Sequence, residues 1–327
     1  MAVLAYLKAE NAYTEAMMQP AQTLADSLYQ DALRHIRETD LGVPYRKGEW
    51  LYYNRTEQGK QYPICCRKRG SLEAPEEVTL DRNTLARGER FMGLDAYVVS
   101  DDGHLLAHTL DRTGFRQYTL HVKDLRTGQL LPDTATNVTS VAWAADNRTL
   151  LYTTEDSAKR SYRVWRHALG NSQPTLVLEE KDERFNVYVS RSRSQTFLWL
   201  NSNSQRQSEW RLLPADRPEA EPQIILPRQP DLEYEADHQG DSLYLRLNDR
   251  GRNFRVIRTP VTDLRPEKWV EVLPHRPNVL LEGLLCLARH TVVLEREQAV
   301  PPARVLPADG SASSRLEFAA PLRRVAP

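Results

Sequence analysis

The sequence predicts an all-β fold built from repeated four-stranded units and preceded by a helical segment. Two observations predict the repeats. The first is a recurring sequence pattern, here called the recurring phrase, that reads as strand, tight turn and strand. The second is its period, because the turns lie about 45 residues apart, near Asp102, Asp146, Ser192 and Gln239. A third observation predicts the helices, because no Gly and one Pro occur between Tyr6 and Thr39.

The helical segment shows apolar residues at helical spacing. Leucine or isoleucine recurs along one predicted helical face, at Leu24, Leu28, Leu33 and Ile36. Pro20 interrupts this stretch, and "DLGVP" (40–44) follows it. We therefore expect two helices that are broken near Pro20 and end at "DLGVP".

The recurring phrase has four clear copies in the sequence. They are "DAYVVSDDGHLLAHTLD" (95–111), "SVAWAADNRTLLYTTED" (140–156), "NVYVSRSRSQTFLWLNS" (186–202) and "YEADHQGDSLYLRLND" (234–249). Fainter copies, "YRKGEWLYYNRT" and "LLCLARHTVVLERE", flank them, and a second pair of apolar runs follows most copies, as in "QYTLHVKDLRTGQLL" (117–131). Four strands per repeat of this length are typical of a β-propeller blade, and we count about six blades. Two packed β-sandwiches would also give short, evenly spaced strands, but would not explain a turn that recurs at one period.

Composition limits the partners and the compartment. The 327 residues include 44 basic and 44 acidic side chains, so no net charge favours nucleic acid or an anionic membrane. Three cysteines, of which Cys65 and Cys66 are adjacent, indicate reduced thiols in a cytoplasmic protein. Residues 1–20 carry Lys8, Glu10 and Glu15 without a continuous apolar run, so we expect neither a signal peptide nor a membrane span.

Motifs that carry chemistry are missing from the sequence. It contains no Gly-x-Ser-x-Gly nucleophile turn, no phosphate-binding P-loop and no Gly-x-Gly-x-x-Gly stretch. His104 and His108 are four apart, which on a strand places them on one face but about 13 Å from each other, too far for one ion. We therefore predict no catalytic, cofactor-binding or metal-binding residue and no cofactor.

The charged run "EEKDERF" (179–185) has two interpretations. Its composition is typical of a solvated hairpin, which is the expected structure. A contact that gates substrate or joins two domains is the alternative.

Several long stretches resemble the N-terminal half of the oligopeptidase B branch of the prolyl oligopeptidase family of serine peptidases. These are "YLKAENAYTEAMM", "DLGVPYRKGEWLYYNRTEQGKQYPICCRKRGSLEAPEEVTLD", "SDDGHLLAHTLDRTGFRQYTLHVKDLRTGQLLPD" and "VAWAADNRTLLYTTED", followed in order by "EEKDERF", "SRSRS", "RNFR" and "HRPNVLLEG". The resemblance implies a seven-bladed propeller that caps an α/β-hydrolase domain. That enzyme type cuts short peptides after Arg or Lys and excludes large folded substrates.

The resemblance also implies an organisation of the chain. Residues 1–70 would form a helical arm, hinge and first strands that begin the hydrolase body, residues 71–298 the propeller blades, and residues 299–327 a truncated blade tail. The family's catalytic serine, aspartate and histidine lie beyond the propeller, so none of them matches a residue here. We expect this chain alone not to hydrolyse peptides; a natural truncation, a split gene and a frameshift all remain open.

Two functions follow from these expectations. The first is the peptide-filtering propeller of a serine endopeptidase, with short peptides and a separately encoded α/β-hydrolase domain as partners. The second is a free-standing propeller that acts as a protein-interaction scaffold. The apolar residues of the helices (Leu24, Leu28, Leu33, Ile36) favour the first, because they would have little to pack on without a hydrolase body.

Overall fold

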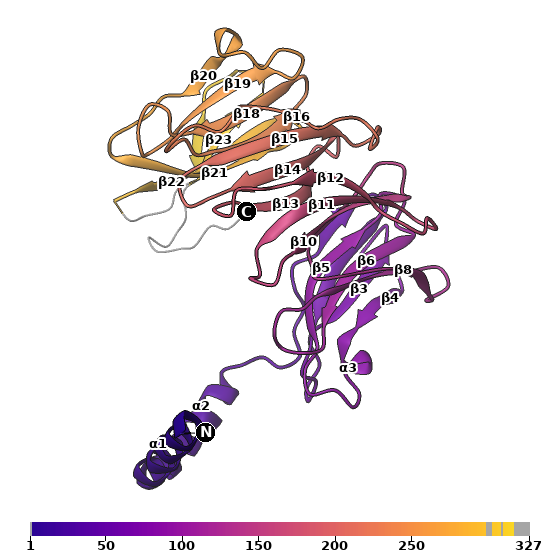
Figure 1. The fold of residues 1–327 in the computed structure, drawn as a ribbon, viewed down its shortest axis with the longest axis vertical. Helices are drawn as coiled ribbons and strands as arrows, with labels where there is room; N and C mark the ends of the chain where they lie inside the picture. Colours follow the sequence, from indigo (N-terminus) through magenta and orange to yellow (C-terminus); the bar gives the residue numbers. More distant parts are fainter. Residues whose placement is uncertain (1, 299–302, 309, 317–327) are drawn as a thin grey trace. The chain divides into compact units, whose positions relative to one another are not determined.

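The computed structural model describes residues 2–298, 303–308 and 310–316. The chain divides into two compact units, Met1–Arg87 and Gly88–Pro327, and each is described by itself. Helices occupy the start of the chain and strands nearly all of the rest (Figure 1). The structure therefore confirms the predicted helical segment and the all-β remainder.

The first unit begins with helices α1 (Ala2–Met18) and α2 (Gln22–Arg34), joined by the short 3-10 turn η1 (Gln19–Ala21). Pro20 lies in the first turn of η1, where its missing N–H costs no helical hydrogen bond. The predicted break near Pro20 is confirmed. No described residue of α1 or α2 is buried.

The same unit contains the first four-stranded sheet. Its strands are β1 (Tyr45–Lys47), β2 (Trp50–Arg55), β3 (Ile64–Arg69) and β4 (Glu76–Asp81), paired in chain order and antiparallel. Tyr53, Ile64 and Cys66 form its buried cluster. One turn of helix, α3 (Arg82–Leu85), follows β4 and is capped by the Asp81 carboxylate, which accepts from the Asn83 N–H at 2.8 Å.

The second unit contains five further sheets, each made of four consecutive antiparallel strands. The second sheet holds β5 (Gly93–Val99), β6 (Leu105–Asp111), β7 (Thr119–Asp124) and β8 (Leu130–Thr136). The third holds β9 (Val138–Trp143), β10 (Thr149–Glu155), β11 (Ser161–Ala168) and β12 (Thr175–Glu179). The fourth holds β13 (Asn186–Arg191), β14 (Phe197–Asn203), β15 (Ser208–Pro214) and β16 (Gln223–Ile224). The fifth holds β17 (Tyr234–Gln239), β18 (Ser242–Leu247), β19 (Arg255–Pro260) and β20 (Val270–Leu273), with the turn η2 (Pro266–Lys268). The sixth holds β21 (Val279–Cys286), β22 (His290–Glu297), β23 (Ala303–Pro307) and β24 (Ser314–Leu316).

The bounds of β4, β23 and β24 can be compared with the three chain segments expected from the sequence, 1–70, 71–298 and 299–327. Strand β4 belongs to the first sheet, so this sheet includes residues on both sides of position 70. Strands β23 and β24 complete the sixth sheet from within residues 299–327. The other parts of that expected tail, 299–302, 309 and 317–327, lie outside the described residues. Six four-stranded sheets agree with the predicted number of blades.

The recurring phrase is a hairpin between the first two strands of a sheet. In the third sheet the turn places Asn147 at a φ of 55°, a left-handed conformation that asparagine tolerates. The Asp146 carboxylate accepts the N–H groups of Arg148 and Thr149 at 3.0 and 2.8 Å. Aspartate and asparagine therefore hold this turn by local hydrogen bonds.

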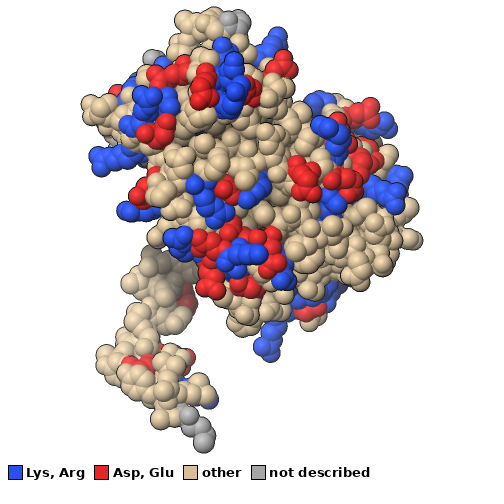
Figure 2. All heavy atoms as spheres, turned by 45° about the horizontal axis from the view of Figure 1, so that its top comes forward, with Lys and Arg blue, Asp and Glu red and all other residues tan. Residues whose placement is uncertain are grey.

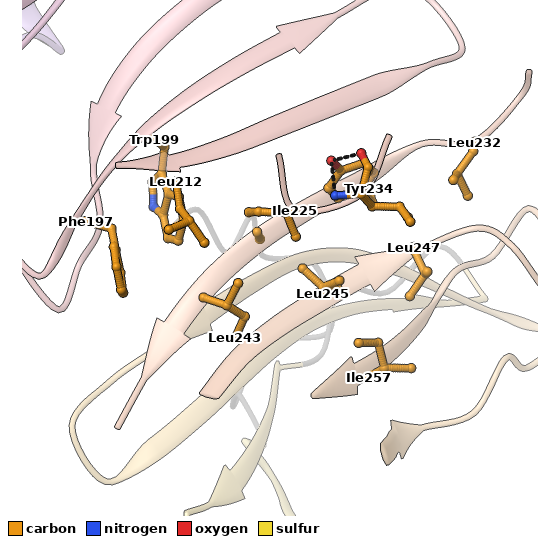
Figure 3. Close-up of a cluster of buried hydrophobic side chains, with 12 residues drawn as sticks. Phe197, Trp199, Leu212, Ile225, Leu232, Tyr234, Leu243, Leu245, Leu247 and Ile257 are labelled. Atoms are coloured by element: carbon orange, nitrogen blue, oxygen red, sulfur yellow. Dashed lines mark hydrogen bonds between the residues drawn. The ribbon is translucent and has the colours of Figure 1, made fainter. Parts of the chain in front are cut away.

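Apolar side chains fill the space between successive sheets of the second unit. The largest cluster joins the fourth and fifth sheets and includes Phe197, Trp199, Leu212, Leu245 and Ile257 (Figure 3). Full burial of a Leu, Ile or Phe side chain contributes roughly 1.5–3 kcal/mol. Sheets that are buried on both faces by their neighbours are typical of propeller blades.

The surface carries both signs of charge. Lys and Arg are interspersed with Asp and Glu over the face shown in Figure 2, in keeping with the equal numbers of basic and acidic residues, 44 each. Among the described helices, none is long and apolar enough to cross a membrane.

Candidate functional site

One serine of the fourth sheet contacts a histidine as a nucleophile would contact its base. The Ser194 Oγ, in the turn between β13 and β14, lies 2.8 Å from the Nδ1 of His238 on β17. Burial lowers the pKa of His238, which favours the neutral ring. The neighbouring Asp237 carboxylate instead accepts the backbone N–H groups of His238 and Cys286, at 2.8 and 2.7 Å. The pair thus joins two sheets, and among the described residues no carboxylate bonds to the histidine ring to orient it as a triad requires.

A second group combines serine, aspartate and histidine in the wrong order for catalysis. The Ser100 hydroxyl donates to Asp102 Oδ1 at 2.5 Å, and His104 Nδ1 lies 3.2 Å from Asp102 Oδ2. The carboxylate therefore separates the histidine from the serine, so the ring cannot take the hydroxyl proton. Burial would raise the pKa of Asp102, but hydrogen bonds from Ser100 and His104 outweigh it and lower the pKa.

The two histidines of "HLLAH" lie in different environments. His104 lies in an exposed turn directly before β6. His108 is buried on β6, and its ring centroid lies 5.7 Å from that of His121. Within residues 2–298, 303–308 and 310–316, no cluster of three or more His, Cys, Asp or Glu could hold a metal ion.

The three cysteines are free and buried. Burial raises the pKa of both Cys65 and Cys66 to about 11. Their thiols are therefore protonated near neutral pH and are poor nucleophiles.

Hydrogen bonds join successive sheets of the second unit at one end. We call this end the turn edge; it consists of the turns between the first and second strands of sheets two to six. Asp102 donates its N–H to the Asn147 side-chain oxygen at 3.0 Å, and Trp143 donates its ring N–H to the Val98 carbonyl at 2.9 Å. Arg191 reaches both Asp101, at 3.1 Å, and the Trp143 carbonyl. These contacts join the second, third and fourth sheets to one another.

The opposite end of the third sheet holds the segment "EEKDERF". We call its residues 180–185, which link β12 to β13, the charged connection. It is not the solvated hairpin that its composition predicts, because it joins two sheets and both its ends, Glu180 and Phe185, are buried. Arg160 donates to the carbonyls of Glu180, Asp182 and Phe185, at 3.1, 3.4 and 3.5 Å. The protein thus holds a defined backbone at this end.

Arg228 anchors the charged connection to the fourth sheet. Its Nη2 lies 2.7 Å from Glu180 and 3.2 Å from Glu209, and its guanidinium carbon lies 4.0 Å above the Phe185 ring. Burial would raise the pKa values of Glu180 and Glu209, but hydrogen bonds and charge from Arg228 outweigh burial and lower them. Sequence patterns gave no sign of this cluster, because Arg228 follows Glu180 by 48 residues.

The sixth sheet contains a second buried carboxylate. The Glu295 side chain has no solvent exposure. Its carboxylate oxygens form ion pairs with the guanidinium nitrogens of Arg276, Arg304 and Arg315, at 2.5, 2.7 and 3.3 Å. Its pKa is lowered because hydrogen bonds from these arginines outweigh burial, which alone would raise it. The cluster ties β22 to β23, to β24 and to the segment before β21.

The helices of the first unit expose many apolar side chains. We call α1, η1, α2 and residues 35–36 the helical arm. Its exposed Leu, Ile, Val, Met and Tyr residues, each at least half exposed, are Val3, Leu4, Tyr6, Leu7, Tyr13, Met17, Met18, Leu24, Leu28, Tyr29 and Ile36. The expected exposure is seen for Leu24, Leu28 and Ile36, whereas Leu33 is half-buried. Apolar exposure on this scale is typical of a surface that another protein body covers.

Six sheets of four consecutive strands define a β-propeller domain with a helical extension. In the part of the chain described, neither of the two serine contacts is arranged as a catalytic triad. The sequence profile of one family, "Prolyl oligopeptidase, N-terminal beta-propeller domain", matches residues 1–325. The chain therefore belongs to the prolyl oligopeptidase family through its N-terminal propeller domain.

Curated relatives and a solved structure agree with this assignment. The chain is 40% identical to Dipeptidyl aminopeptidase BI of Pseudoxanthomonas mexicana, over 94% of this chain and 45% of that protein. It is 32% identical to Protease 2 of Moraxella lacunata, over 86% of this chain and 44% of that protein. The structure of Oligopeptidase B from Leishmania major matches with a TM-score of 0.90 at 26% identity, over 98% of this chain and 47% of that one. The chain thus spans less than half the length of these relatives.

Proposed function

We propose that this chain is the peptide-filtering propeller of an oligopeptidase B-like serine endopeptidase. A hydrolase domain that cuts short peptides after Arg or Lys would be its partner, and the propeller would exclude large folded substrates. The proposal is supported by membership of the prolyl oligopeptidase family and by similarity to Protease 2 and Oligopeptidase B. The chain alone would not cleave peptides, because neither Ser194 nor Ser100 has the partners that activate a serine.

The exposed apolar surface of the helical arm is the observation that carries this proposal. Leu24 and Leu28 are 63% and 60% exposed and lie one helical turn apart on α2. A hydrolase body that covered the arm would remove this apolar surface from water. A free-standing scaffold, the alternative function, gives no reason for such an arm.

Similarity to Dipeptidyl aminopeptidase BI supports a second candidate activity. The assembled enzyme would then remove dipeptides from free N-termini rather than cut within blocked peptides. The two activities require the same propeller, so they differ in the substrates of the assembled enzyme.

The compartment forms part of the proposal. Cys65, Cys66 and Cys286 are free thiols, and none is placed to form a disulfide in the structure. This use of cysteine fits the reducing cytoplasm.

Reconstitution tests the proposed function. The purified chain would be mixed with the C-terminal hydrolase half of the Pseudoxanthomonas mexicana relative, and association measured by analytical ultracentrifugation. We expect a one-to-one complex that cleaves short peptides but spares a large folded protein, whereas the hydrolase half alone lacks this selection. Blocked peptides with Arg, Lys or Leu before the cleaved bond, and dipeptide substrates with a free N-terminus, then separate the two activities. Failure to associate with this half and with that of Protease 2 would overturn the proposal.

A further inference from the structure

A hollow in the second unit opens at the turn edge. It has a volume of about 550 Å3 and is lined by residues of the third, fourth and fifth sheets. This volume lies within the usual range for sites that bind small ligands. The hollow contains none of the residues considered above as a nucleophile or metal ligand.

The inner wall of the hollow is apolar and rigid. Phe197 and Leu212 line it and are only 7% and 4% exposed, and Val261, directly after β19 of the fifth sheet, joins them. The Phe197 ring is held on two sides, with Trp199 stacked at 5.8 Å and His238 edge-on at 4.9 Å between centroids. Figure 3 shows Phe197, Trp199 and Leu212 close together in the cluster between these sheets. The wall is therefore formed before any ligand arrives.

The rim supplies uncharged hydrogen-bonding groups. Gln223 and Thr262 line the hollow, and the structure gives their side chains no hydrogen-bond partner among the described residues. Strand β16 is two residues long, so the outer edge of the fourth sheet ends beside the hollow. An amide group of a bound peptide can bond to such a rim.

Arg217 adds a cation to the same rim. Its Nε lies 3.9 Å from Asp216 Oδ1, and its side chain is 72% exposed, so this ion pair is long and solvated. The corresponding turn of the fifth sheet holds Arg265 at 2.6 Å from Asp263. The Arg217 guanidinium is therefore free to exchange the distant Asp216 for a carboxylate that approaches in a better geometry.

We propose that this hollow binds the C-terminal residue of a short peptide that ends in a large apolar side chain. The side chain occupies the wall formed by Phe197, Leu212 and Val261, the α-carboxylate pairs with Arg217, and the peptide N–H donates to Gln223 or Thr262. The site rests on the proposed function, because short peptides are then the molecules the propeller meets. It lies at the end of the sheets opposite the charged connection and takes no part in bond cleavage.

Binding to the chain alone tests the site. The probes are acetyl-Gly-Phe, which has a free carboxylate, and acetyl-Gly-Phe-amide, which has none, titrated by calorimetry and by tryptophan emission. We expect the acid to bind with a dissociation constant of roughly 0.1–1 mM and the amide several-fold more weakly. Equal affinities for the two probes would overturn the role of Arg217, and no binding of either at 5 mM would overturn the site.

Two variants with matched controls locate the binding. Arg217→Gln should weaken binding of the acid about three- to tenfold and leave the amide unchanged, whereas Arg265→Gln should change neither. Thr262→Trp should fill the hollow and abolish binding of both probes. Thr127→Trp, in an exposed turn of the second sheet, should not. Retained acid binding by a folded Thr262→Trp chain would contradict the proposal. Association with the hydrolase half is measured separately, so its failure is distinguishable from failure of this site.

Discussion

The indole N–H of Trp143 donates to the carbonyl of Val98, 45 residues earlier in the chain, at 2.9 Å. This bond joins the first strand of the third sheet to the first strand of the second. Trp143 is 1% exposed, so Trp143→Phe removes this hydrogen bond from a buried interface. We expect the free energy of unfolding to fall by about 2 kcal/mol, measured by urea denaturation.

Trp269→Phe is the control for this prediction. Trp269 also donates its ring N–H to a carbonyl, that of Leu264, but within its own sheet and only partly buried. Its loss should lower stability less. If both variants lost the same free energy of unfolding, the hydrogen bond between sheets would contribute no more to stability than the bond within one sheet.

Arg228→Met should destabilise the junction of the third and fourth sheets. It leaves the carboxylates of Glu180 and Glu209, which are 7% and 6% exposed, without their shared cation. Removing one partner of a buried ion pair costs about 3–5 kcal/mol, and we expect about 3 because Arg228 is 27% exposed. Arg184→Met removes an exposed arginine that pairs with Asp182 in the same connection, and should leave the urea midpoint nearly unchanged.

The same cluster predicts a pH dependence. The pKa values of Glu180 and Glu209 lie below the ordinary 4.5, so their contribution to stability is present above that pH and is lost as pH falls through the lowered values. Without Arg228 the buried carboxylates take up protons at higher pH. The difference in urea midpoint between wild type and Arg228→Met should therefore shrink from pH 7 to pH 4, and a constant difference would contradict this assignment.

Glu295→Gln should loosen the sixth sheet. The amide cannot balance Arg276, Arg304 and Arg315, which then lie close together with less negative charge between them. We expect faster hydrogen exchange in β22 and β23, with sheets two to four unchanged. Glu282→Gln, which removes a partly exposed pair with Arg296, should have little effect.

Leu24→Glu with Leu28→Glu tests the helical arm. Both side chains are exposed, so the urea midpoint of the chain should not change, while binding of a hydrophobic dye should decrease. Association with a hydrolase half should weaken at least tenfold. The control is Gln22→Glu with Gln30→Glu, which adds the same charge to exposed polar positions of α2. A wild-type chain that binds no dye would argue against an uncovered surface.

The fold was predictable because it depends on local patterns. Turns such as Asp146–Asn147 are held by hydrogen bonds between residues at most three positions apart, so their residue types can be recognised in the sequence. The ion clusters were not predictable, because Glu180 and Arg228 meet across two sheets and each is an ordinary charged residue in its own segment. "EEKDERF" was misread for the same reason: its composition indicates solvent, whereas Glu180 and Phe185 are buried by partners elsewhere. The hollow beside Phe197 depends on the spacing between sheets, which no single segment encodes.

The bonds between sheets at the turn edge have an evolutionary consequence. Several of them join residues separated by nearly one repeat, as with Asp102 and Asn147 at 45 positions, Val98 and Trp143 at 45, and Asp237 and Cys286 at 49. Duplication of a gene segment of that length would add one complete sheet and repeat the spacing at which these bonds form. Blade number would therefore change by whole units during evolution, and each new contact would again lie about one repeat from its partner.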